Sequence, residues 1–427
     1  MKYALVNPAW EFHGSTYFGC QESHYPLELL FAFDKVREAG HEPLLIDAHS
    51  DHLQLDEVKQ TVAAFAPDFL VIPTAPSYLF WRCPPPEMKV PQTWFAALNA
   101  GIKVAIGPHP SATPRATLRK LQCDVALRGE PDEIIPLLAS ASWQDLEGCC
   151  WRKEGTLQVS PTLGVTNMAN LKALDFQNYN VEGHTHRHHV FEGHGRGAEL
   201  EFARGCPWAC SFCNKTLFRN KYRERDVAAV LEEVDRLISR GVDYIYFIDE
   251  IFGVGKNVHR LLEGLAERKI TIGLQTRIDL WNEESLDLLG RAHCVSMEVG
   301  IESITEEGRS ELNKGCKLDT ERIGDLLIHA RKRVPWVQAN LILTEHDDRH
   351  DIRQWQERLK AHGVWVSDPV PMFPFPGTPD YLKRFGPPDD LAWERAHHYY
   401  TTTFHNKGYS DIQDQNPSEL EDLECTF

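Results

Sequence analysis

Arg204-Gly205-Cys206-Pro207-Trp208-Ala209-Cys210-Ser211-Phe212-Cys213 is the stretch that decides the fold of this chain. Its three cysteines have C-x3-C-x2-C spacing after a hydrophobic run, and the next cysteine along the chain is Cys294. Thiolates are the usual protein ligands of iron-sulfur clusters. The loop therefore predicts a cubane cluster with three irons held by Cys206, Cys210 and Cys213 and one iron open to chemistry. Zinc is the alternative, but structural zinc favours paired cysteine knuckles that close a tetrahedron.

Length and composition limit the class of protein. A chain of 427 residues is too long for one ordinary core and predicts two or three domains. Apolar content of 42% and charged content of 25% are typical of a soluble globular protein. No apolar stretch of about 18 residues and no signal peptide is found, so we expect a cytoplasmic protein without a membrane partner. The net charge of -17 argues against a nucleic-acid partner and leaves a small-molecule substrate, neutral or cationic.

The first 140 residues alternate short β runs with helical runs, which predicts a doubly wound parallel sheet covered by helices on both faces. The expected strands are 3–6, 43–47, 69–73, 103–106 and 124–127, and the expected helices are 27–39, 55–66, 92–100, 114–121 and 132–139. Ligands of such sheets bind at the carboxyl ends of the strands. Polar and turn-forming residues gather at these ends: Asn7, Thr74, Ser77, Tyr78, Gly107, Pro108, His109, Pro110, Arg128, Gly129 and Glu130.

From residue 198 the alternation resumes, with the cysteine loop as its first turn. The expected strands are 199–203, 244–248, 272–276, 295–301, 337–343 and 364–370. A helix is expected over 226–240, with its apolar residues on one stripe and Asp226 as N-cap. The intervening segment, 141–197, reads as a connector with a hairpin at 151–160 and a short helix at 167–175.

Polar residues stand at the carboxyl ends of the second, third and fourth of these strands, where an apolar lining would be expected. They are Asp249, Glu250, Gln275, Arg277, Glu298 and Glu302. Because successive side chains of a strand point to opposite faces, Glu298 and Glu302 lie on the same face of their strand. Ordinary ion pairing is the alternative explanation for such carboxylates.

The cysteine loop resembles that of the radical S-adenosylmethionine (SAM) superfamily, as do Gly300-Ile301-Glu302-Ser303 and Leu312-Asn313-Lys314-Gly315. The resemblance implies a 4Fe-4S cluster whose open iron is chelated by SAM, a partial (βα)6 barrel, and an electron donor such as flavodoxin or ferredoxin. It implies that carboxylates bind the SAM ammonium and ribose while Arg277 binds the SAM carboxylate. The SAM contacts implied are Phe212, Asp249, Glu250, Gln275, Arg277, Glu298 and Glu302.

Two further motifs, Ile106 to Ser111 and Cys123 to Glu130, together resemble the cobalamin-binding domain that precedes many radical SAM domains. The resemblance implies cobalamin contacts from the strand-end residues of the first 140 residues: Asn7, Thr74, Ser77, Tyr78, Gly107, Pro108, His109, Pro110, Arg128, Gly129 and Glu130. A plain doubly wound domain whose glycines form turns is the alternative. Cobalamin domains that supply a histidine to cobalt carry D-x-H-x-x-G after the first strand, whereas here Asn7 replaces the Asp and His13 is displaced. The resemblance thus implies cobalt without a protein histidine beneath it.

We therefore expect an α/β chain of four parts: a doubly wound cobalamin-binding-like domain over 1–140, a connector over 141–197, a partial radical SAM barrel over 198–376 and a C-terminal extension over 377–427. The connector holds a histidine tract from His184 to His194. Such a tract can bind metal, although no paired cysteine or carboxylate stands at ligand spacing, and a solvated or substrate-facing loop is the alternative.

The two resemblances together imply a reaction. In such enzymes the reduced cluster cleaves SAM to a 5′-deoxyadenosyl radical, and cobalamin delivers a methyl group to the substrate. We expect a cobalamin-dependent radical SAM methyltransferase that acts on an unactivated carbon of a small metabolite or natural-product intermediate. A cobalamin-dependent cyclase or rearrangement enzyme without methyl transfer is the alternative. A non-catalytic cobalamin or redox sensor would need an output domain, which the sequence does not show.

Overall fold

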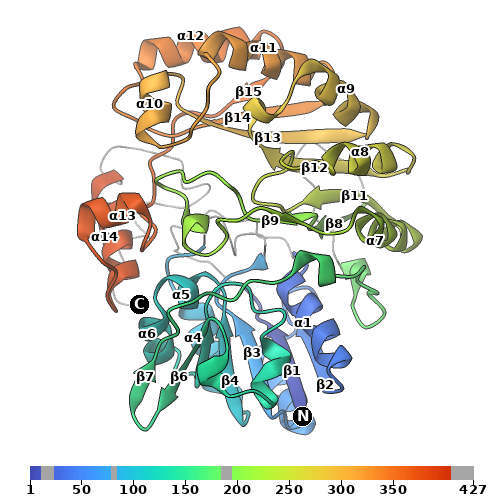
Figure 1. Cartoon of the computed structure of the whole chain (residues 1–427), viewed down its shortest axis with the longest axis vertical. Helices are drawn as coiled ribbons and strands as arrows, with labels where there is room; N and C mark the ends of the chain where they lie inside the picture. Colours follow the sequence, from blue (N-terminus) through green and yellow to red (C-terminus); the bar gives the residue numbers. More distant parts are fainter. Residues whose placement is uncertain (11–23, 78–83, 184–194, 405–427) are drawn as a thin grey trace.

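The computed structural model of the chain describes residues 1–10, 24–77, 84–183 and 195–404. Its two main sheets lie one above the other along the long axis, the N-terminal sheet at the bottom of Figure 1 and the second sheet at the top. The expectations for His13, for Tyr78 and for the histidines at 184–194 lie outside the described residues, as do residues 405–427 of the C-terminal extension.

The N-terminal sheet has seven strands in the order β2-β1-β3-β4-β5-β6-β7, of which the first five are parallel. The strands are β1 Lys2–Asn7, β2 Glu42–Asp47, β3 Phe69–Pro73, β4 Ile102–Ile106, β5 Val125–Leu127, β6 Cys149–Lys153 and β7 Thr156–Gln158. The five strands expected in this region are confirmed to within about one residue at each end. The hairpin expected around Glu154-Gly155 is β6 and β7, and it continues this sheet in antiparallel pairing.

Helices cover both faces of this sheet, as the alternating pattern predicted. Strand residues of one parity, such as Leu5 and Val71, share a core with α1 (Leu27–Glu38) and the 3-10 helix η1 (Ile135–Ala139). Residues of the other parity, such as Val6 and Ile72, share a core with the helices on the opposite face. Those helices are α2 Leu55–Phe65, α4 Lys89–Ala97 and α6 Pro114–Lys120. The short helix α5 (Pro108–Ala112) follows β4 directly.

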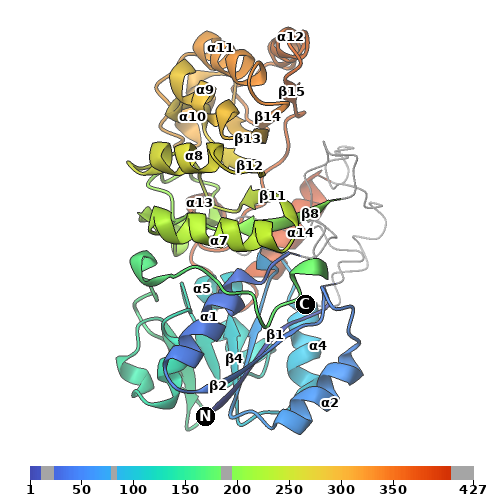
Figure 2. The ribbon, with the colours of Figure 1, turned by 90° about the vertical axis from the view of Figure 1, so that its right-hand side faces the viewer.

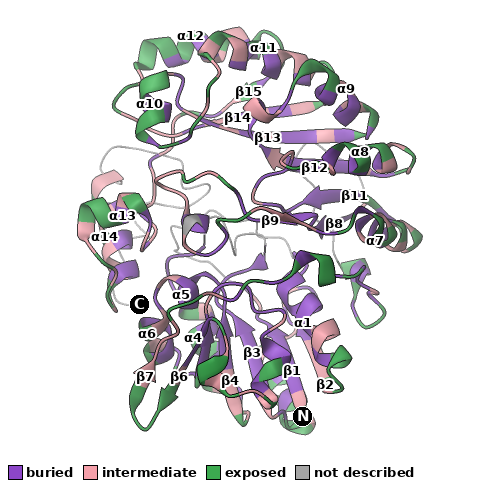
Figure 3. Cartoon of the chain, viewed as in Figure 1, coloured by how far each residue is buried: buried purple, intermediate pink, exposed green. Residues whose placement is uncertain are grey.

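The second sheet is entirely parallel, with six strands in the order β15-β14-β13-β12-β11-β8. The strands are β8 Arg196–Leu200, β11 Val242–Phe247, β12 Thr271–Thr276, β13 Cys294–Glu302, β14 Trp336–Leu341 and β15 Trp365–Val366. The helices that connect them are α7 Val227–Ser239, α8 Val258–Ala266, α9 Glu283–Arg291, α10 Glu306–Glu311, α11 Thr320–Arg331 and α12 Arg349–Lys360. Figures 1 and 2 show these helices outside the curved sheet, and Figure 3 shows their outer sides exposed and the strands largely buried. The expected partial (βα)6 barrel is confirmed.

The first barrel strand differs from its expected range of 199–203. β8 ends at Leu200, and Ala203–Arg204 forms a separate strand, β9, that pairs antiparallel with β10 (Arg223–Glu224). The Asp249 carboxylate causes this break, because it accepts the N–H groups of Phe202 at 2.8 Å and Ala203 at 3.0 Å. The N–H groups of Phe202 and Ala203 thus donate to a side chain, that of Asp249, and not to a neighbouring strand.

The helix expected over 167–175 was wrong. Only a 3-10 turn forms there, η3 (Met168–Asn170). Arginine side chains from the barrel bind the next carbonyl groups instead: Arg225 donates to the oxygens of Leu171 and Lys172, and Arg236 donates to those of Ala173 and Leu174. A helix would have used these carbonyl groups within its own turns.

After the barrel the chain returns to the N-terminal sheet through α13 (Pro379–Phe385) and α14 (Ala392–Phe404). Trp393 of α14 is 1% exposed, and its Nε1 donates to Thr113 Oγ1 at 2.9 Å beside α5. Across the described ranges, no helix combines the length and apolar character that a membrane crossing needs.

Candidate functional site

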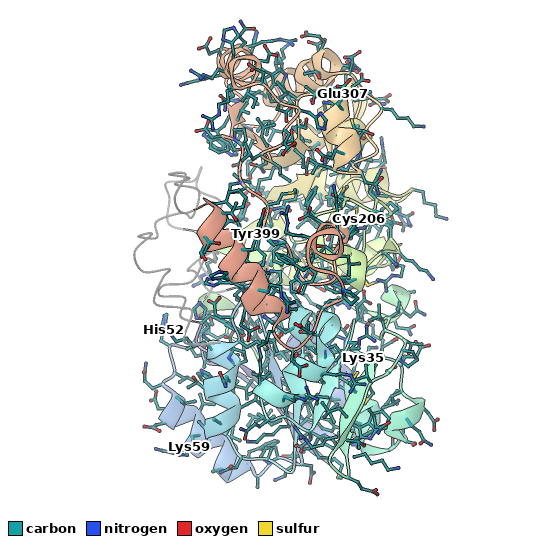
Figure 4. All side chains as sticks on the ribbon, turned by 90° about the vertical axis from the view of Figure 1, so that its left-hand side faces the viewer. Lys35, His52, Lys59, Cys206, Glu307 and Tyr399 are labelled. Atoms are coloured by element: carbon teal, nitrogen blue, oxygen red, sulfur yellow. The ribbon has the colours of Figure 1, made fainter. Side chains whose placement is uncertain are left out.

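The cysteine loop leaves the carboxyl end of the first barrel strand through Gly205. The φ angle of Gly205 is +86°, and a Cβ there would lie well under 3.0 Å from the carbonyl oxygen of Lys221. Only glycine tolerates both the angle and the close approach. Cys206 follows at once and is buried, and Figure 4 shows it at mid-height in the molecule.

The rest of the loop is held by segments distant in sequence. Ser211 N donates to Leu312 O at 2.9 Å, and Asn313 Nδ2 donates to Ala209 O at 2.7 Å. Helix α13 adds a third contact, from Asp380 N to Ser211 O at 3.1 Å. Cys210 and Cys213 are half-buried. The three thiols thus lie in one loop whose backbone is fixed on several sides.

Buried cations surround these thiols. Burial raises the pKa of Cys206, of Cys210 and of Cys213, and nearby positive charge opposes that rise. Lys215 acts on Cys206 and Cys213 and also donates to the carbonyl oxygens of Cys206 and Trp208. Lys314 acts on Cys210. Cations stabilise thiolates, so this loop suits the thiolate ligands of an iron-sulfur cluster.

Polar side chains line the concave face of the barrel sheet. Gln275 and Glu298 are register partners on β12 and β13, and Gln275 Nε2 donates to Glu298 Oε2 at 3.0 Å. Tyr246 of β11 donates its hydroxyl to Glu298 Oε1 at 3.2 Å. On β14, Gln338 Nε2 donates to Asn340 Oδ1 at 2.8 Å. The structure thus brings together two of the expected SAM-binding residues and adds Tyr246.

Arg277 and Glu302, also expected at SAM, are paired with protein groups. Arg277 donates to both oxygens of Asp279, at 3.0 and 2.7 Å, and its guanidinium lies 4.4 Å from the ring centre of Trp208. Glu302 forms an ion pair with Lys314 at 2.6 Å. Both pairs lie beside the cysteine loop, where Arg277 lowers and Glu302 raises the pKa of Cys210.

Asp249 and Glu250 hold backbone near the cysteines. Asp249 uses both carboxylate oxygens on the N–H groups of Phe202 and Ala203. Glu250 accepts Gly205 N at 2.6 Å and Arg219 Nη1 at 2.6 Å. Phe212 is half-buried in the same loop. Contacts of these three residues with SAM stay a prediction.

The carboxyl edge of the N-terminal sheet carries buried polar atoms without hydrogen bonds. Thr74 Oγ1 after β3 and both ring nitrogens of His109 after β4 make no hydrogen bond to any described residue. Burial lowers the pKa of His109 to about 3, although the nearby carbonyl groups of Pro86, Pro85 and Thr74 oppose the shift. Gly107 has φ +116°, which a larger residue would resist. Buried polar groups normally have partners, so this edge suits a polar ligand.

The other residues expected at cobalamin have protein partners. Asn7 donates to Asp47 Oδ1 at 2.8 Å, and Ser77 donates to Glu28. Pro108 and Pro110 are buried in α5. Arg128 Nη1 donates to Ser160 O at 2.6 Å, Gly129 packs on Gly164, and Glu130 binds arginines of the barrel region. Their contacts with cobalamin stay predictions.

The sequence analysis missed two buried carboxyl groups between the sheets. Glu199 of β8 lies 2.5 Å from His24 Nδ1, and its other oxygen accepts Tyr25 N at 2.9 Å. Glu28 is fully buried at the start of α1, and burial raises its pKa to about 7 against the hydrogen bond from Ser77. No motif marks either residue, because each acquires its surroundings only when the two sheets meet.

Residues 200–356 match the model of the radical SAM superfamily. The chain is 27% identical over 377 residues to the hopanoid C-3 methylase of Methylococcus capsulatus, covering 81% of this chain and 67% of the relative. It is 26% identical to the anaerobic magnesium-protoporphyrin IX monomethyl ester cyclase of Synechocystis sp., covering 75% and 65%. It is 24% identical to an uncharacterized methyltransferase of Pyrococcus horikoshii, covering 68% and 63%. The chain therefore spans about two thirds of the length of these relatives.

Two solved structures share the fold of nearly the whole chain. The radical SAM methyltransferase TsrM of Kitasatospora setae, solved with cobalamin and a 4Fe-4S cluster, has a TM-score of 0.67 at 17% identity and covers 90% of this chain and 77% of its own. The cobalamin-dependent SAM radical enzyme OxsB, solved with aqua-cobalamin and SAM, has a TM-score of 0.69 at 15% identity and covers 99% and 70%. The chain therefore shares with these enzymes a fold in which a doubly wound domain is followed by a partial barrel.

Proposed function

We propose that this chain, a radical SAM protein by its residues 200–356, methylates an unactivated carbon of a small metabolite with the help of a 4Fe-4S cluster, SAM and cobalamin. One observation carries the proposal. The cysteine loop at the carboxyl end of β8 meets the carboxyl edge of the N-terminal sheet, where Arg204 beside Cys206 binds Asp132 after β5 at 2.5 Å. Ligands of parallel sheets bind at such edges, so two cofactor sites would face each other.

In this proposal Cys206, Cys210 and Cys213 hold the cluster. When bound, the cluster supplies the electron that cleaves SAM, and the electron reaches it from a flavodoxin- or ferredoxin-like donor in the cytoplasm. Lys215 and Lys314 balance the thiolate charge. The loop backbone, held by Leu312 and Asp380, keeps the three ligands in place.

The concave face of the barrel would bind SAM and substrate. Glu298 offers a carboxylate to the SAM ammonium or ribose, and Tyr246 and Gln275 hold that carboxylate in place. Phe212, Asp249, Glu250, Arg277 and Glu302 complete the proposed SAM environment.

Cobalamin would bind at the carboxyl edge of the N-terminal sheet and supply the methyl group. Thr74 and His109 offer the buried polar atoms that have no other described partner, and Gly107 lets the ligand approach the backbone. His109 is neutral, because burial lowers its pKa to about 3, and its ring packs at a tilt against Trp393 with ring centres 4.4 Å apart. When cobalamin is bound, His109 would contact its nucleotide tail.

A second function has specific support. The relatives include cyclases as well as methylases, at nearly the same identity. A cobalamin-dependent radical SAM cyclase would use the same two cofactor sites and would transfer no methyl group.

Cofactor loading tests the proposal. Anaerobic reconstitution of the chain with iron, sulfide and hydroxocobalamin should load a cluster and cobalt. Replacement of Cys206, Cys210 and Cys213 by Ala should abolish iron and sulfide binding, because the cluster loses its protein ligands. Cys294→Ala is the matched control, since Cys294 is buried in β13 and should not affect iron content. Full iron retention in the triple variant would reject the site.

A further inference from the structure

A network of buried charged side chains joins the two parts of the molecule behind the cysteine loop. Its members are Glu130, Asp132, Glu201, Arg204, Arg219, Arg223 and Glu250. The side chain of Arg223 is 21% exposed, and those of the other six are at most 4% exposed. Glu130 and Asp132 follow β5 of the N-terminal sheet, and the other five belong to the barrel region.

Asp132 links the N-terminal domain to the barrel region through Arg204. Arg204 donates to both of its oxygens, at 2.5 and 3.1 Å, and Arg204 Nε donates to Glu201 at 2.8 Å. Burial raises the pKa of Asp132, but Arg204, Thr166 and Arg219 together outweigh burial, so that the pKa is lowered. Thr166 Oγ1 donates to Asp132 Oδ2 at 2.8 Å from the N-terminal side.

Glu130 is a second link. Arg223 donates to both Glu130 oxygens, at 2.9 and 2.5 Å, and Arg219 Nε lies 3.3 Å from Oε1. The N–H group of Thr166 donates to Glu130 Oε2 at 2.7 Å. The sequence predicted that Glu130 contacts cobalamin, whereas in the structure it forms ion pairs with three arginines of the barrel region, Arg204, Arg219 and Arg223.

The same network reaches the backbone of the first cysteine. Gly205 N donates to Glu250 Oε2 at 2.6 Å, and Arg219 Nη1 donates to Glu250 Oε1 at 2.6 Å. Cys206 N donates to the carbonyl oxygen of Arg219 at 3.1 Å. A displacement of Arg204 or Arg219 would therefore move the residues that bear the first iron ligand.

We propose that Glu130 and Asp132 are positioning residues that anchor the cluster loop on the N-terminal domain, so that the cluster keeps a fixed position relative to cobalamin. The proposal rests on the proposed function and specifies how its two cofactor sites are aligned. Buried charges that lose a partner are strongly destabilising, so the network permits one arrangement of the two edges. Small displacements of reacting groups lower reaction rates greatly. A fixed arrangement of the two cofactor sites would therefore maintain the rate of the reaction.

The test compares wild type, Asp132→Asn and Thr166→Val, each purified anaerobically and reconstituted with iron, sulfide and hydroxocobalamin. Asp132→Asn removes the charge that pairs with Arg204, whereas Thr166→Val removes a hydrogen bond to the same carboxylate and keeps the ion pair. Hydrogen exchange is measured on the amides of Gly205 and Cys206, and pulsed electron paramagnetic resonance measures the distance between Co(II) and the reduced cluster.

In Asp132→Asn we expect at least tenfold faster exchange at Gly205 and Cys206, unchanged exchange in β14, and a broader cobalt–cluster distance distribution. Thr166→Val should match wild type. Unchanged exchange in Asp132→Asn, or equal effects in both variants, would overturn the anchoring. If Asp132→Asn does not fold, Arg223→Gln at the partly exposed end gives the same readout. Wild-type protein that binds iron but no cobalt would reject the proposed function. The exchange rates at Gly205 and Cys206 would still show whether Asp132 anchors the cysteine loop on the N-terminal domain.

Discussion

At the scale of single residues, Gly205 determines whether the cysteine loop can form. We expect Gly205→Ala to bind much less iron after reconstitution, because a Cβ would strike the carbonyl group of Lys221 and push Cys206 away. Gly155→Ala is the matched control, since Gly155 has a similar φ of +80° and open space around it. The control should lose only about 1 kcal/mol of stability and keep its iron. Equal iron content in the two variants would contradict the role of Gly205.

Glu28 gives a prediction that depends on pH. Its folded-state pKa of about 7 lies above the ordinary 4.5, because the carboxyl group is buried. Its contribution to stability is therefore fully present below about pH 4.5 and is lost as the pH rises through about 7. Relative to wild type, Glu28→Gln should gain about 2 kcal/mol in unfolding free energy between pH 5 and pH 8. Urea denaturation at both values measures this gain, with exposed Glu42→Gln as control. A constant difference between Glu28→Gln and wild type would show that Glu28 does not titrate in this range.

At the scale of elements, regular hydrophobic patterns predicted the strands well, and side-chain contacts from distant residues account for the errors. The five N-terminal strands could be predicted from the local sequence pattern of each strand alone. The range 167–175 looked helical, but Arg225 and Arg236 take its carbonyl groups, and that competition cannot be read from the local sequence. In the same way, the cysteines could be predicted from spacing alone, whereas the contacts of Glu130 and Glu199 arise only at the interface between the sheets.

The C-terminal helix α14 gives the prediction at this scale. Trp393 is nearly fully buried between His109 and Thr113, so Trp393→Ala should lower the unfolding free energy by about 3 kcal/mol. It should also open the chain near Gly386 to limited proteolysis, because α14 loses its main contact with α5. Trp365→Ala, at a tryptophan that is 43% exposed, should leave both measurements close to wild type. Undiminished protection of α14 in Trp393→Ala would show that other contacts hold the helix.

At the scale of the whole molecule, the carboxyl edge of the N-terminal sheet meets the β8 side of the barrel sheet, and buried ion pairs and helix α1 fix the two together. Helix α1 packs Leu29 and Val36 on the N-terminal sheet and Leu30 and Phe31 on the barrel core. Such a helix has an apolar surface on two sides, which is typical of an element buried between two layers. The order of the two folds could be predicted from the sequence. Their relative placement could not, because it depends on contacts between residues more than 70 positions apart, such as Arg204 and Asp132.

The central claim is that both sites serve one methyl transfer, and isotope labelling tests it most directly. The reconstituted enzyme is incubated with reductant, cobalamin, methyl-deuterated SAM and the small-molecule fraction of an anaerobic cell extract, and the products are measured by mass spectrometry. We predict both 5′-deoxyadenosine and S-adenosylhomocysteine, together with a small molecule that gains a deuterated methyl group. One SAM makes the radical and the other supplies the methyl group, so both coproducts are required. Formation of 5′-deoxyadenosine with an unlabelled, cyclised or rearranged product and without S-adenosylhomocysteine would contradict the account and favour the cyclase.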